Sequence, residues 1–268
     1  MMKTLFAKIK KDPTSGSSIH LKNLICQLQQ YMKDGVDRNT LYKGLLEVQQ
    51  VFPLFKVLEH FIEAFRKAPS QTDIPAFIMA YQKQWSAINE QVASNALNYL
   101  NLDRKTLLLH SNSGAIQAIC QLAKAQGQNF KIIQTESRPA HEGRQQALYL
   151  ANSGIKVTMV ADTAITREFP PWDMAIVGAD AIFQDAFINK IGTYGIGLAC
   201  KELQRPLFLL ADSRKLARQK VSPELKEARK PADELWPGAP SLIEVSNYYF
   251  EKTPLHLIQK CITEEALL

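Results

Sequence analysis

The segment TLLLHSNSGAIQAICQLAKAQGQNFKII, residues 106–133, decides the fold. It contains two short apolar runs, residues 106–109 and 130–133, separated by an amphipathic segment at about 114–126. Each run has the length of a strand buried in a parallel sheet, and the intervening segment has the apolar spacing of a helix. This segment therefore predicts one β-α-β unit.

The same alternation continues along the chain. Further strand-like runs occupy residues 157–160, 174–177 and 207–210, and helix candidates lie at about 141–153 and 192–203. Strands that alternate with helices are typical of a parallel sheet wound with right-handed crossovers. The sequence therefore predicts an α/β domain over residues 102–268.

Residues 18–100 follow a different pattern, with apolar side chains recurring every three or four residues. That period predicts a helical bundle. Breaks are expected near Gly35, Pro53 and Pro69, and a long helix is expected from about Asp73 to Leu100. We therefore predict a helical amino-terminal domain over residues 1–101.

Composition limits the class of protein. The chain has 268 residues, of which 46% are hydrophobic and 22% charged, a balance typical of a folded globular protein. Its apolar runs are too short for a membrane span or a signal peptide, so we expect no membrane association and a cytoplasmic location. The four cysteines are widely spaced in helix-like apolar contexts, which indicates buried free thiols rather than a disulfide framework or a metal site.

The net charge of +6 raises the question of nucleic-acid binding. The excess is spread along the chain, with 12 basic and 8 acidic groups in residues 1–100 and 20 and 18 in the remainder. A nucleic-acid interface normally concentrates Lys and Arg in one stripe. A nucleic-acid or ribosome-associated role is therefore the weakest of the hypotheses considered below.

Polar residues follow each predicted strand, and in an open parallel sheet ligands bind at this edge. Taken one at a time, Ser113, Asp162 and Asp180 could each cap a helix or close a turn. Taken together, the strand ends favour a polar pocket. The polar clusters are residues 110–114, 135–139, 161–163, 178–180 and 211–215.

The segment from Val177 to Gly195 is the most informative of these regions. Its glycines do not match the spacing of a dinucleotide-binding loop, which disfavours a nicotinamide cofactor, and we expect no cofactor. We expect a loop to return Asn189 and Lys190 toward Asp180, where Lys190 would hold Asp180 ionised. The helix expected to begin at Gly192 and Thr193 would offer its free amides to an anion.

These motifs resemble a known family. The resemblance to the alpha, beta and delta regulatory subunits of translation initiation factor 2B covers about residues 103–265, and that family is related to the isomerases of methylthioribose-1-phosphate and ribose-1,5-bisphosphate. The matching segments are residues 136–139, 143–144, 154–158 with Asp162, 177–180, 189–194, 208–215, 253–255 and 262–264.

The resemblance implies a helical amino-terminal domain, a Rossmann-like carboxy-terminal domain that forms a homodimer, and an interdomain pocket for a sugar phosphate or nucleoside phosphate. The positions that match the catalytic pair of the isomerases are Ser111 and Asp180. We also expect the ligand to be bound by Arg138, Asn189, Lys190, Asn112 and Gly16.

The sequence departs from the isomerases in two places. Ser111 occupies the position of their catalytic cysteine, and a serine hydroxyl is a far weaker acid than a thiol. His110 is adjacent, but consecutive residues at a strand end point in opposite directions, so a Ser-His pair does not follow. The second departure is Thr14–Ser18, where the isomerases carry an Arg-Gly pair that contacts phosphate; without the arginine, Gly16 and neighbouring hydroxyls would bind phosphate differently.

Two main hypotheses follow. In the first, the protein binds a sugar phosphate or nucleotide without efficient turnover, as a signal or to favour assembly with a protein partner. In the second, it is a divergent aldose-ketose isomerase in which Asp180 acts as acid or base and Ser111 or a water assists.

Overall fold

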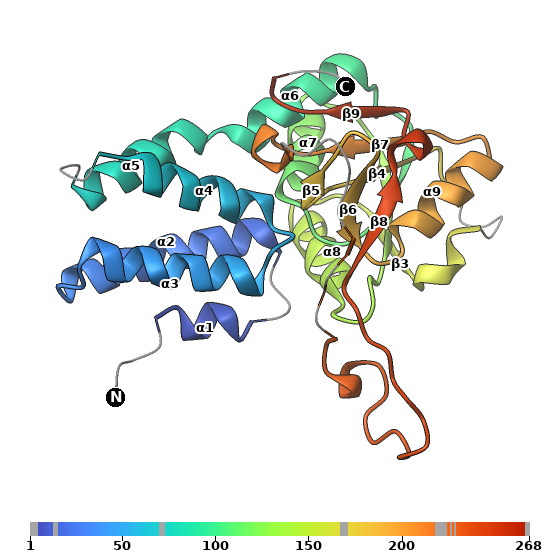
Figure 1. The fold of residues 1–268 in the computed structure, drawn as a ribbon. Coiled ribbons are helices and arrows are strands. Elements are labelled where there is room, and N and C mark those ends of the chain that lie inside the picture. Colours follow the sequence, from blue (N-terminus) through green and yellow to red (C-terminus); the bar gives the residue numbers. More distant parts are fainter. Residues whose placement is uncertain are drawn as a thin grey trace. The chain divides into compact units, whose positions relative to one another are not determined.

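A computed structural model describes residues 5–12, 16–69, 73–166, 171–217, 224–225, 227 and 229–265. The chain divides into two compact units, Met1–Ala87 and Ile88–Leu268. The first is helical and the second contains the sheets, so the predicted fold class is confirmed. Figure 1 shows the elements of each unit.

The helical unit contains α1 (Ala7–Lys10), α2 (Ser17–Lys33), α3 (Arg38–Val51), α4 (Lys56–Lys67) and α5 (Ile74–Trp85). Helix α4 shows why these segments are helical, because Val57, Leu58, Phe61, Ile62 and Phe65 are buried along one stripe. Asp37 caps the start of helix α3, because its carboxylate accepts hydrogen bonds from the amides of Asn39 and Thr40, both at 3.0 Å.

The expected helix from Asp73 to Leu100 is two helices, because α5 ends at Trp85 and α6 (Ile88–Tyr99) begins after a turn. Ser86 Oγ donates to the carbonyl of Lys83 at 3.0 Å, a local bond that competes with helix continuation. The structure therefore divides the chain after Ala87, earlier than the predicted boundary at residue 101. The reason is that Val92, Ala93 and Ala96 of α6 are buried in the core of the sheet-containing unit.

The larger sheet has six parallel strands in the order β3-β2-β1-β4-β7-β9. Numbered within this sheet, that order is the 3-2-1-4-5-6 order of the Rossmann fold. The strands are β1 (Thr106–Leu109), β2 (Lys131–Thr135), β3 (Val157–Val160), β4 (Met174–Val177), β7 (Leu207–Leu210) and β9 (Lys260–Ile262). The sequence predicted the first five and missed β9, which has only three residues.

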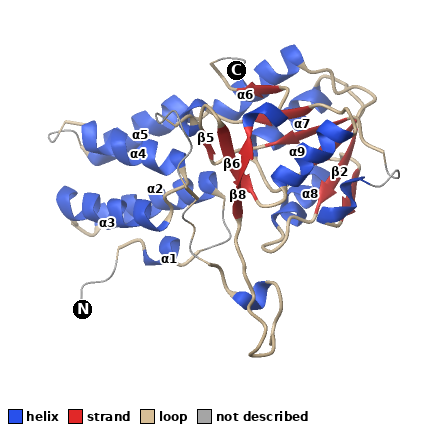
Figure 2. Ribbon diagram, turned by 45° about the vertical axis from the view of Figure 1, so that its right-hand side comes forward, coloured by secondary structure: helices blue, strands red, loops and turns tan. Residues whose placement is uncertain are grey.

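Successive residues of the central strands point to opposite faces of this sheet. Leu107 and Leu109 belong to one buried cluster with α6 and α7 (Gly114–Ala125), whereas Leu108 belongs to another with α9 (Thr193–Glu202). The sheet therefore carries helices on both faces, as Figure 2 shows. Helix α8 (Glu142–Asn152) contributes Leu150 to the first cluster.

A second sheet of three antiparallel strands follows β4. It consists of β5 (Ala181–Ile182), β6 (Ala186–Lys190) and β8 (Phe250–Pro254), with β6 in the centre. The sequence placed Asn189 and Lys190 in a loop, but they end β6. The β5–β6 hairpin does return them toward Asp180, whose amide donates to the carbonyl of Ile188 at 2.8 Å.

Before β8, residues 229–249 extend away from the sheet (Figure 1), and we call them the arm. Its base is closed by the Lys230 amide, which donates to the carbonyl of Asn247 at 2.9 Å. The arm exposes large apolar side chains, among them Trp236 at 49% and Leu242 at 99% relative exposure.

The cysteines are free. Cys120, Cys200 and Cys261 are buried, and burial raises the pKa of each thiol to about 12, so these side chains are neutral packing groups. Cys26 is exposed, contrary to the prediction, because it lies beside the buried stripe of α2 formed by Leu21, Leu24, Ile25 and Leu28.

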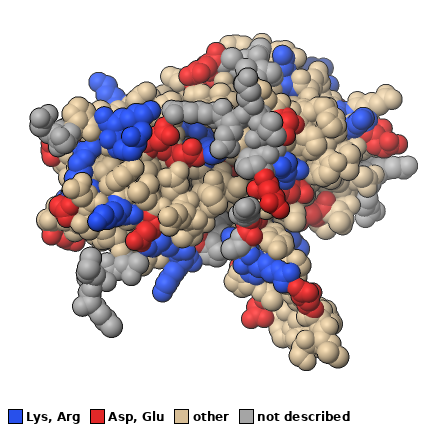
Figure 3. All heavy atoms as spheres, in the orientation of Figure 1, with Lys and Arg blue, Asp and Glu red and all other residues tan. Residues whose placement is uncertain are grey.

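The distribution of charge and of apolar residues concerns two of the expectations above, those about nucleic-acid binding and membrane association. Figure 3 shows Lys and Arg side chains interspersed with Asp and Glu on the face that it draws. Within the described ranges, no helix is both long enough and apolar enough to cross a membrane.

The contact between α8 and the end of β2 generates a prediction about stability. A Cβ added to Gly143 would lie 1.9 Å from the carbonyl oxygen of Thr135 and 2.9 Å from Ser137 Oγ. We expect Gly143→Ala to lower the free energy of unfolding by about 3 kcal/mol, because α8 must shift to relieve the clash. Urea unfolding followed by circular dichroism measures the change.

Gly195→Ala is the matched control, because Gly195 lies in α9 and a Cβ there meets nothing within 4 Å. We expect this variant to be as stable as the wild type or more stable by up to about 1 kcal/mol, since alanine favours the helix. Equal stability of the two variants would show that the close approach of α8 to β2 is not a constraint.

Candidate functional site

The candidate site lies where the strand order of the six-stranded sheet reverses, between β1 and β4. At such a point the connections leave neighbouring strands in opposite directions and open a crevice at their carboxyl ends. Residues 110–113 follow β1, and residues 178–180 follow β4. The predicted catalytic residues Ser111 and Asp180 thus follow the two strands that flank this crevice.

His110 is buried and forms part of the framework of the site. Its Nε2 lies 2.9 Å from the carbonyl oxygen of Ile191, which can only accept, so Nε2 carries the proton. Nδ1 then accepts from Thr135 Oγ1 at 2.6 Å. Burial lowers the pKa of His110 to about 4, although the charge of Asp162 opposes that shift. The ring is therefore neutral at pH 7 and both nitrogens are engaged.

Two serines at the ends of β1 and β2 adopt the left-handed backbone conformation, each with φ of 64°. The Ser111 amide donates to Ser137 Oγ at 2.8 Å. Asp162 holds the second turn, because its two carboxylate oxygens accept from the amides of Ser137 and Arg138, both at 2.7 Å. Left-handed non-glycine residues are uncommon and concentrate at functional sites, where neighbouring groups hold them in place.

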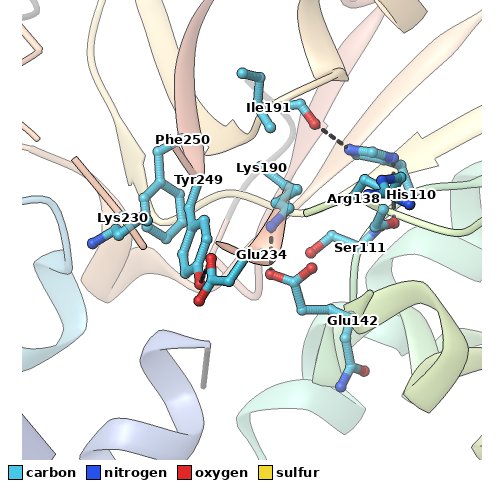
Figure 4. A network of polar contacts seen from close by, with 12 residues as sticks. His110, Ser111, Arg138, Glu142, Lys190, Ile191, Lys230, Glu234, Tyr249 and Phe250 are labelled. Atoms are coloured by element: carbon cyan, nitrogen blue, oxygen red, sulfur yellow. Dashed lines mark hydrogen bonds and ion pairs between the residues drawn. The ribbon is translucent and has the colours of Figure 1, made fainter. Parts of the chain in front are cut away.

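Lys190 is the central charged group of the site. Its side chain is 2% exposed, and Nζ lies 2.7 Å from Glu142 Oε1 and 4.5 Å from the centroid of the Tyr249 ring. Figure 4 shows Lys190 between Tyr249 and Glu142, with the Ser111 side chain directed toward the Glu142 carboxylate. A carboxylate and an aromatic face thus compensate a buried ammonium group.

The charges of neighbouring carboxylates also affect the pKa values of Glu142 and Lys190. Burial raises the pKa of Glu142; the charge of Lys190 opposes the shift and that of Asp180 adds to it. Burial also lowers the pKa of Lys190, against the charges of Glu142, Glu227 and Asp162. The structure therefore gathers Asp162, Asp180, Glu142 and Lys190 into one electrostatic cluster.

Tyr249 connects this cluster to the arm. Its hydroxyl donates to Glu234 Oε2 at 2.6 Å, and Lys230 Nζ lies 5.1 Å from its ring centroid. Asn247 Nδ2 donates to the same carboxylate oxygen of Glu234 at 2.9 Å. Figure 4 shows Lys230, Glu234, Tyr249 and Lys190 in this arrangement. The base of the arm and the Lys190 site thus share one polar network.

The expected anion site at the start of α9 has an internal occupant. Glu251 Oε1 accepts from the amides of Gly192 and Tyr194, both at 2.7 Å. Burial raises the pKa of Glu251, and these backbone bonds oppose the shift. A carboxylate of β8 therefore takes the position in which the sequence suggested a ligand anion.

The strand ends after β7 and β9 are also paired internally. Arg214 Nε donates to Asp212 Oδ1 at 2.7 Å in a buried ion pair. Burial raises the pKa of Asp212, but the charges of Lys215 and Arg214 outweigh it, and the pKa lies below its usual value. Glu264 accepts from the Ser213 amide at 2.9 Å. These residues stabilise the sheet edge.

The remaining predicted ligand residues differ in their surroundings. Asn189 is buried and its Nδ2 donates to Thr193 Oγ1 at 3.0 Å. Asn112 Oδ1 accepts from Gln117 Nε2 at 2.8 Å. Arg138 is exposed, on the turn that Asp162 holds.

Gly16 belongs to the other unit, where it precedes α2 as the N-cap. Its carbonyl accepts from the amides of Ile19 and His20, both at 3.0 Å. Thr14 and Ser15 lie outside the described residues. The roles of Gly16, Asn112, Arg138 and Asn189 in ligand binding stay predictions.

Glu142 and Tyr249 are residues that the sequence did not single out. Glu142 immediately precedes Gly143 of a motif used for the resemblance, and an acidic residue there was the available signal. Tyr249 gave no signal, because it lies far along the chain from Lys190. Among the described residues, no group of three or more His, Cys, Asp or Glu side chains is placed to hold a metal ion.

The buried neutral state of His110 predicts a pH dependence of stability. Its pKa is 6.5 when unperturbed and about 4 in the folded protein, so the unfolded chain binds the proton more readily between these values. The contribution is fully present above pH 6.5 and is lost as the pH falls toward 4, by on the order of 3 kcal/mol. Urea unfolding at pH 7 and pH 4 measures it.

We expect His110→Asn to be less stable at pH 7 but to lose less stability than the wild type on acidification. His256→Asn removes an exposed histidine and should keep the wild-type pH dependence. A His110→Asn variant with the full wild-type acid sensitivity would show that His110 is not the group responsible.

Comparisons of the sequence and of the fold with known proteins identify the family of this chain. The model of the family described as "Initiation factor 2 subunit family" matches residues 57–268. A ribose 1,5-bisphosphate isomerase of Archaeoglobus fulgidus is 35% identical over 170 residues, covering 60% of this chain and 53% of that protein. A protein of Pyrococcus furiosus named as eIF-2B subunit 2-like is 32% identical over 163 residues, covering 60% and 57%.

These curated relatives are longer than the matched region, so the chain spans little more than half of their length. A solved structure of the Pyrococcus horikoshii translation initiation factor eIF-2B has a TM-score of 0.83 over 97% of this chain and 94% of that one. At 24% identity this likeness establishes the fold.

Proposed function

Because this chain belongs to the initiation factor 2 subunit family, we propose that it binds a sugar phosphate or nucleoside phosphate beside Asp180 and Lys190 without efficient turnover. The relatives named as isomerases of ribose 1,5-bisphosphate support the ligand class. The relatives named as eIF-2B subunit-like support a binding role in which chemistry is not required.

The observation that carries the proposal is the environment of Ser111. In the isomerases that this chain resembles, a cysteine of this loop shares proton transfer with the aspartate that matches Asp180. Here the hydroxyl has replaced the thiol, and the neighbouring His110 has both nitrogens bonded to Thr135 and Ile191. A neutral histidine engaged in this way does not serve as the base for Ser111, and an unactivated serine transfers protons poorly near pH 7.

The geometry of the loops supports ligand binding more than it supports catalytic turnover. The turn of Ser111 is held by Ser137, and the turn of Arg138 by Asp162, so hydrogen bonds within the chain fix the shape of both loops. Preorganised loops lose little conformational entropy on binding. Arg138 is exposed on its turn and offers the forked guanidinium that suits phosphate.

The exposed apolar side chains of the arm support the proposal that this protein binds a second copy of itself or another protein. It exposes several large apolar side chains close together in the sequence, and such groups mark interaction surfaces when they are contiguous. A homodimer or a protein partner, and a cytoplasmic location, stay predictions. The exposed residues are Leu235, Trp236, Leu242 and Ile243.

The test of the function is phosphorus NMR of the protein with ribose 1,5-bisphosphate, methylthioribose 1-phosphate and AMP, one time course each. We expect broadened or shifted resonances of at least one ligand and no growth of a ketose phosphate signal. Asp180→Asn should raise the dissociation constant of that ligand by about tenfold, because a charged acceptor is lost.

Asp34→Asn removes an exposed carboxylate of the helical unit and should leave the affinity unchanged. A ketose phosphate that forms with the wild type and not with Asp180→Asn would establish the isomerase alternative instead. A protein that affects none of the three spectra would contradict the proposed ligand class.

The oligomeric state has its own measurement. Light scattering on the purified chain should give about twice the mass of 30.2 kDa. If the apolar side chains of the arm form the contact, Leu242→Asp should shift the protein to the monomer and leave the far-UV circular dichroism spectrum of the folded chain unchanged. A wild-type monomer at all concentrations would overturn the dimer.

A further inference from the structure

The amino-terminal edge of the six-stranded sheet lies opposite the candidate site, and lysines stand at the start of three neighbouring strands there. Lys105 precedes β1, Lys131 is the first residue of β2, and Lys156 precedes β3. The Lys131 amide donates to the carbonyl of Lys105 at 2.9 Å, and the amide of Ile132 donates to the carbonyl of Lys156 at 3.0 Å. The backbone thus places the three lysines side by side. We call these lysines and the neighbouring Arg104 the basic edge.

The ammonium groups of the basic edge are not neutralised within the described part of the chain. Lys105, Lys131 and Lys156 are exposed, and none of them forms an ion pair with a described residue. The Arg104 side chain is 91% exposed, and its Nε lies 3.6 Å from Asp103 Oδ2. An ion pair this exposed is weak and leaves the guanidinium group accessible. The basic edge therefore presents an excess of positive charge to the solvent.

Hydrogen bonds hold the loops that carry these cations. The Arg104 amide donates to the carbonyl of Asn129 at 2.6 Å, and the Asn129 amide donates to Asp103 Oδ1 at 2.8 Å. The amide of Leu102 donates to Gln128 Oε1 at 2.9 Å. The loops before β1 and β2 are thus joined by three bonds, and a surface fixed in this way loses little conformational entropy when a partner docks.

Two further contacts define the extent of the basic edge. On the side of β3, Lys124 Nζ of α7 donates to the carbonyls of Ser153 and Gly154, at 2.6 and 2.8 Å, and holds the loop that leads to this strand. On the other side, β4 begins after Asp173, whose Oδ2 accepts from the Thr106 amide at 2.7 Å. The basic edge therefore covers the starts of β1, β2 and β3 and ends at β4.

From these observations we propose that the basic edge is a docking surface for an extended acidic segment of a protein partner. Neighbouring parallel strands lie about 4.8 Å apart, so the three lysines span about 10 Å. Acidic side chains at alternate positions of an extended segment recur about every 7 Å on one face, so two or three carboxylates cover the row. The proposal does not depend on the ligand of the candidate site, which lies at the opposite edge of the sheet.

A nucleic acid is the other polyanion that exposed cations can bind, and the composition of these loops disfavours it. Proteins hold single strands largely through aromatic side chains on which the bases stack. Residues 101–105, 126–130 and 153–156 contain one aromatic residue, Phe130, and it is 7% exposed. The basic edge thus offers charge without a stacking surface, which suits carboxylates better than bases.

The experiment is fluorescence anisotropy of the full chain with a fluorescein-labelled decapeptide of alternating Asp and Ser, at low ionic strength. The same decapeptide with Asn in place of Asp is the uncharged control. We expect the acidic peptide to bind at least about tenfold more tightly than its Asn counterpart, and to lose affinity when salt is added, because salt screens exposed charges.

Two triple variants locate the binding surface. The test variant combines Lys105→Gln, Lys131→Gln and Lys156→Gln, and it should raise the dissociation constant of the acidic peptide by about tenfold, because three exposed charge pairs are lost. The control variant removes three exposed lysines of the helical unit, so both variants have the same net charge, and it should bind as the wild type does. Its substitutions are Lys22→Gln, Lys43→Gln and Lys83→Gln.

Equal affinities of the two triple variants would overturn the proposal, as would a wild type that binds both peptides equally or neither. A third probe is fluorescein-labelled single-stranded oligouridine. If the RNA binds more tightly than the acidic peptide and the test variant loses that binding, the occupant is a nucleic acid and the proposal is overturned. None of these results alters the proposed function of the candidate site.

Far-UV circular dichroism checks that the triple variants are folded. Arg104→Gln keeps the proposal testable if the test variant is not, because it replaces a single exposed side chain. It should raise the dissociation constant of the acidic peptide about twofold or more. Wild-type affinity of a folded Arg104→Gln protein would exclude Arg104 from the docking surface and contradict the basic edge as defined.

Discussion

A buried ammonium group is the constraint on which the site depends. Lys190 ends the central strand of the antiparallel sheet with 2% of its side chain exposed, and a charge in that position requires compensation from the protein. Glu142 supplies a carboxylate from α8, and Tyr249 supplies an aromatic face next to β8. Three segments far apart in the sequence are thereby held at one point.

The polar groups around Lys190 are of two kinds: most form hydrogen bonds within the protein, and a few keep atoms that the described residues do not use. His110 is hydrogen-bonded to the Thr135 hydroxyl and the Ile191 carbonyl. Ser137, Asp162 and Glu251 accept hydrogen bonds from backbone amides. These contacts explain why polar residues at strand ends, which suggested ligand contacts, are partly structural. Within the described residues, Arg138 is exposed and the second carboxylate oxygen of Glu142 accepts no hydrogen bond.

This division also bears on how a family can contain both enzymes and binding subunits. The fold supplies the crevice between β1 and β4 whatever the chemistry, and a single side chain after β1 decides whether a readily ionised group is present. A thiol can be tuned toward neutral pH by its surroundings, whereas a serine hydroxyl requires a base. In this chain His110 is hydrogen-bonded to Thr135 and Ile191, and Ser137 holds the turn of Ser111.

The sequence by itself determined the helical first unit, five strands of the parallel sheet and the helices between them, because these depend on local periodicity. The ends of the predicted parallel strands directed attention to residues 110–114 and 178–180, and the family resemblance gave Ser111, Asp180 and Lys190 their expected roles. Three features were decided only by the tertiary structure: the division after Ala87, the strand β9 and the partners of Lys190. The unit boundary depends on which core α6 joins, β9 is too short to have a pattern, and the Glu142 and Tyr249 contacts join residues 48 and 59 positions from Lys190. Local periodicity predicts whether a segment forms a helix or a strand. The partners of a buried charge are set by tertiary packing, which brings together residues far apart in the sequence.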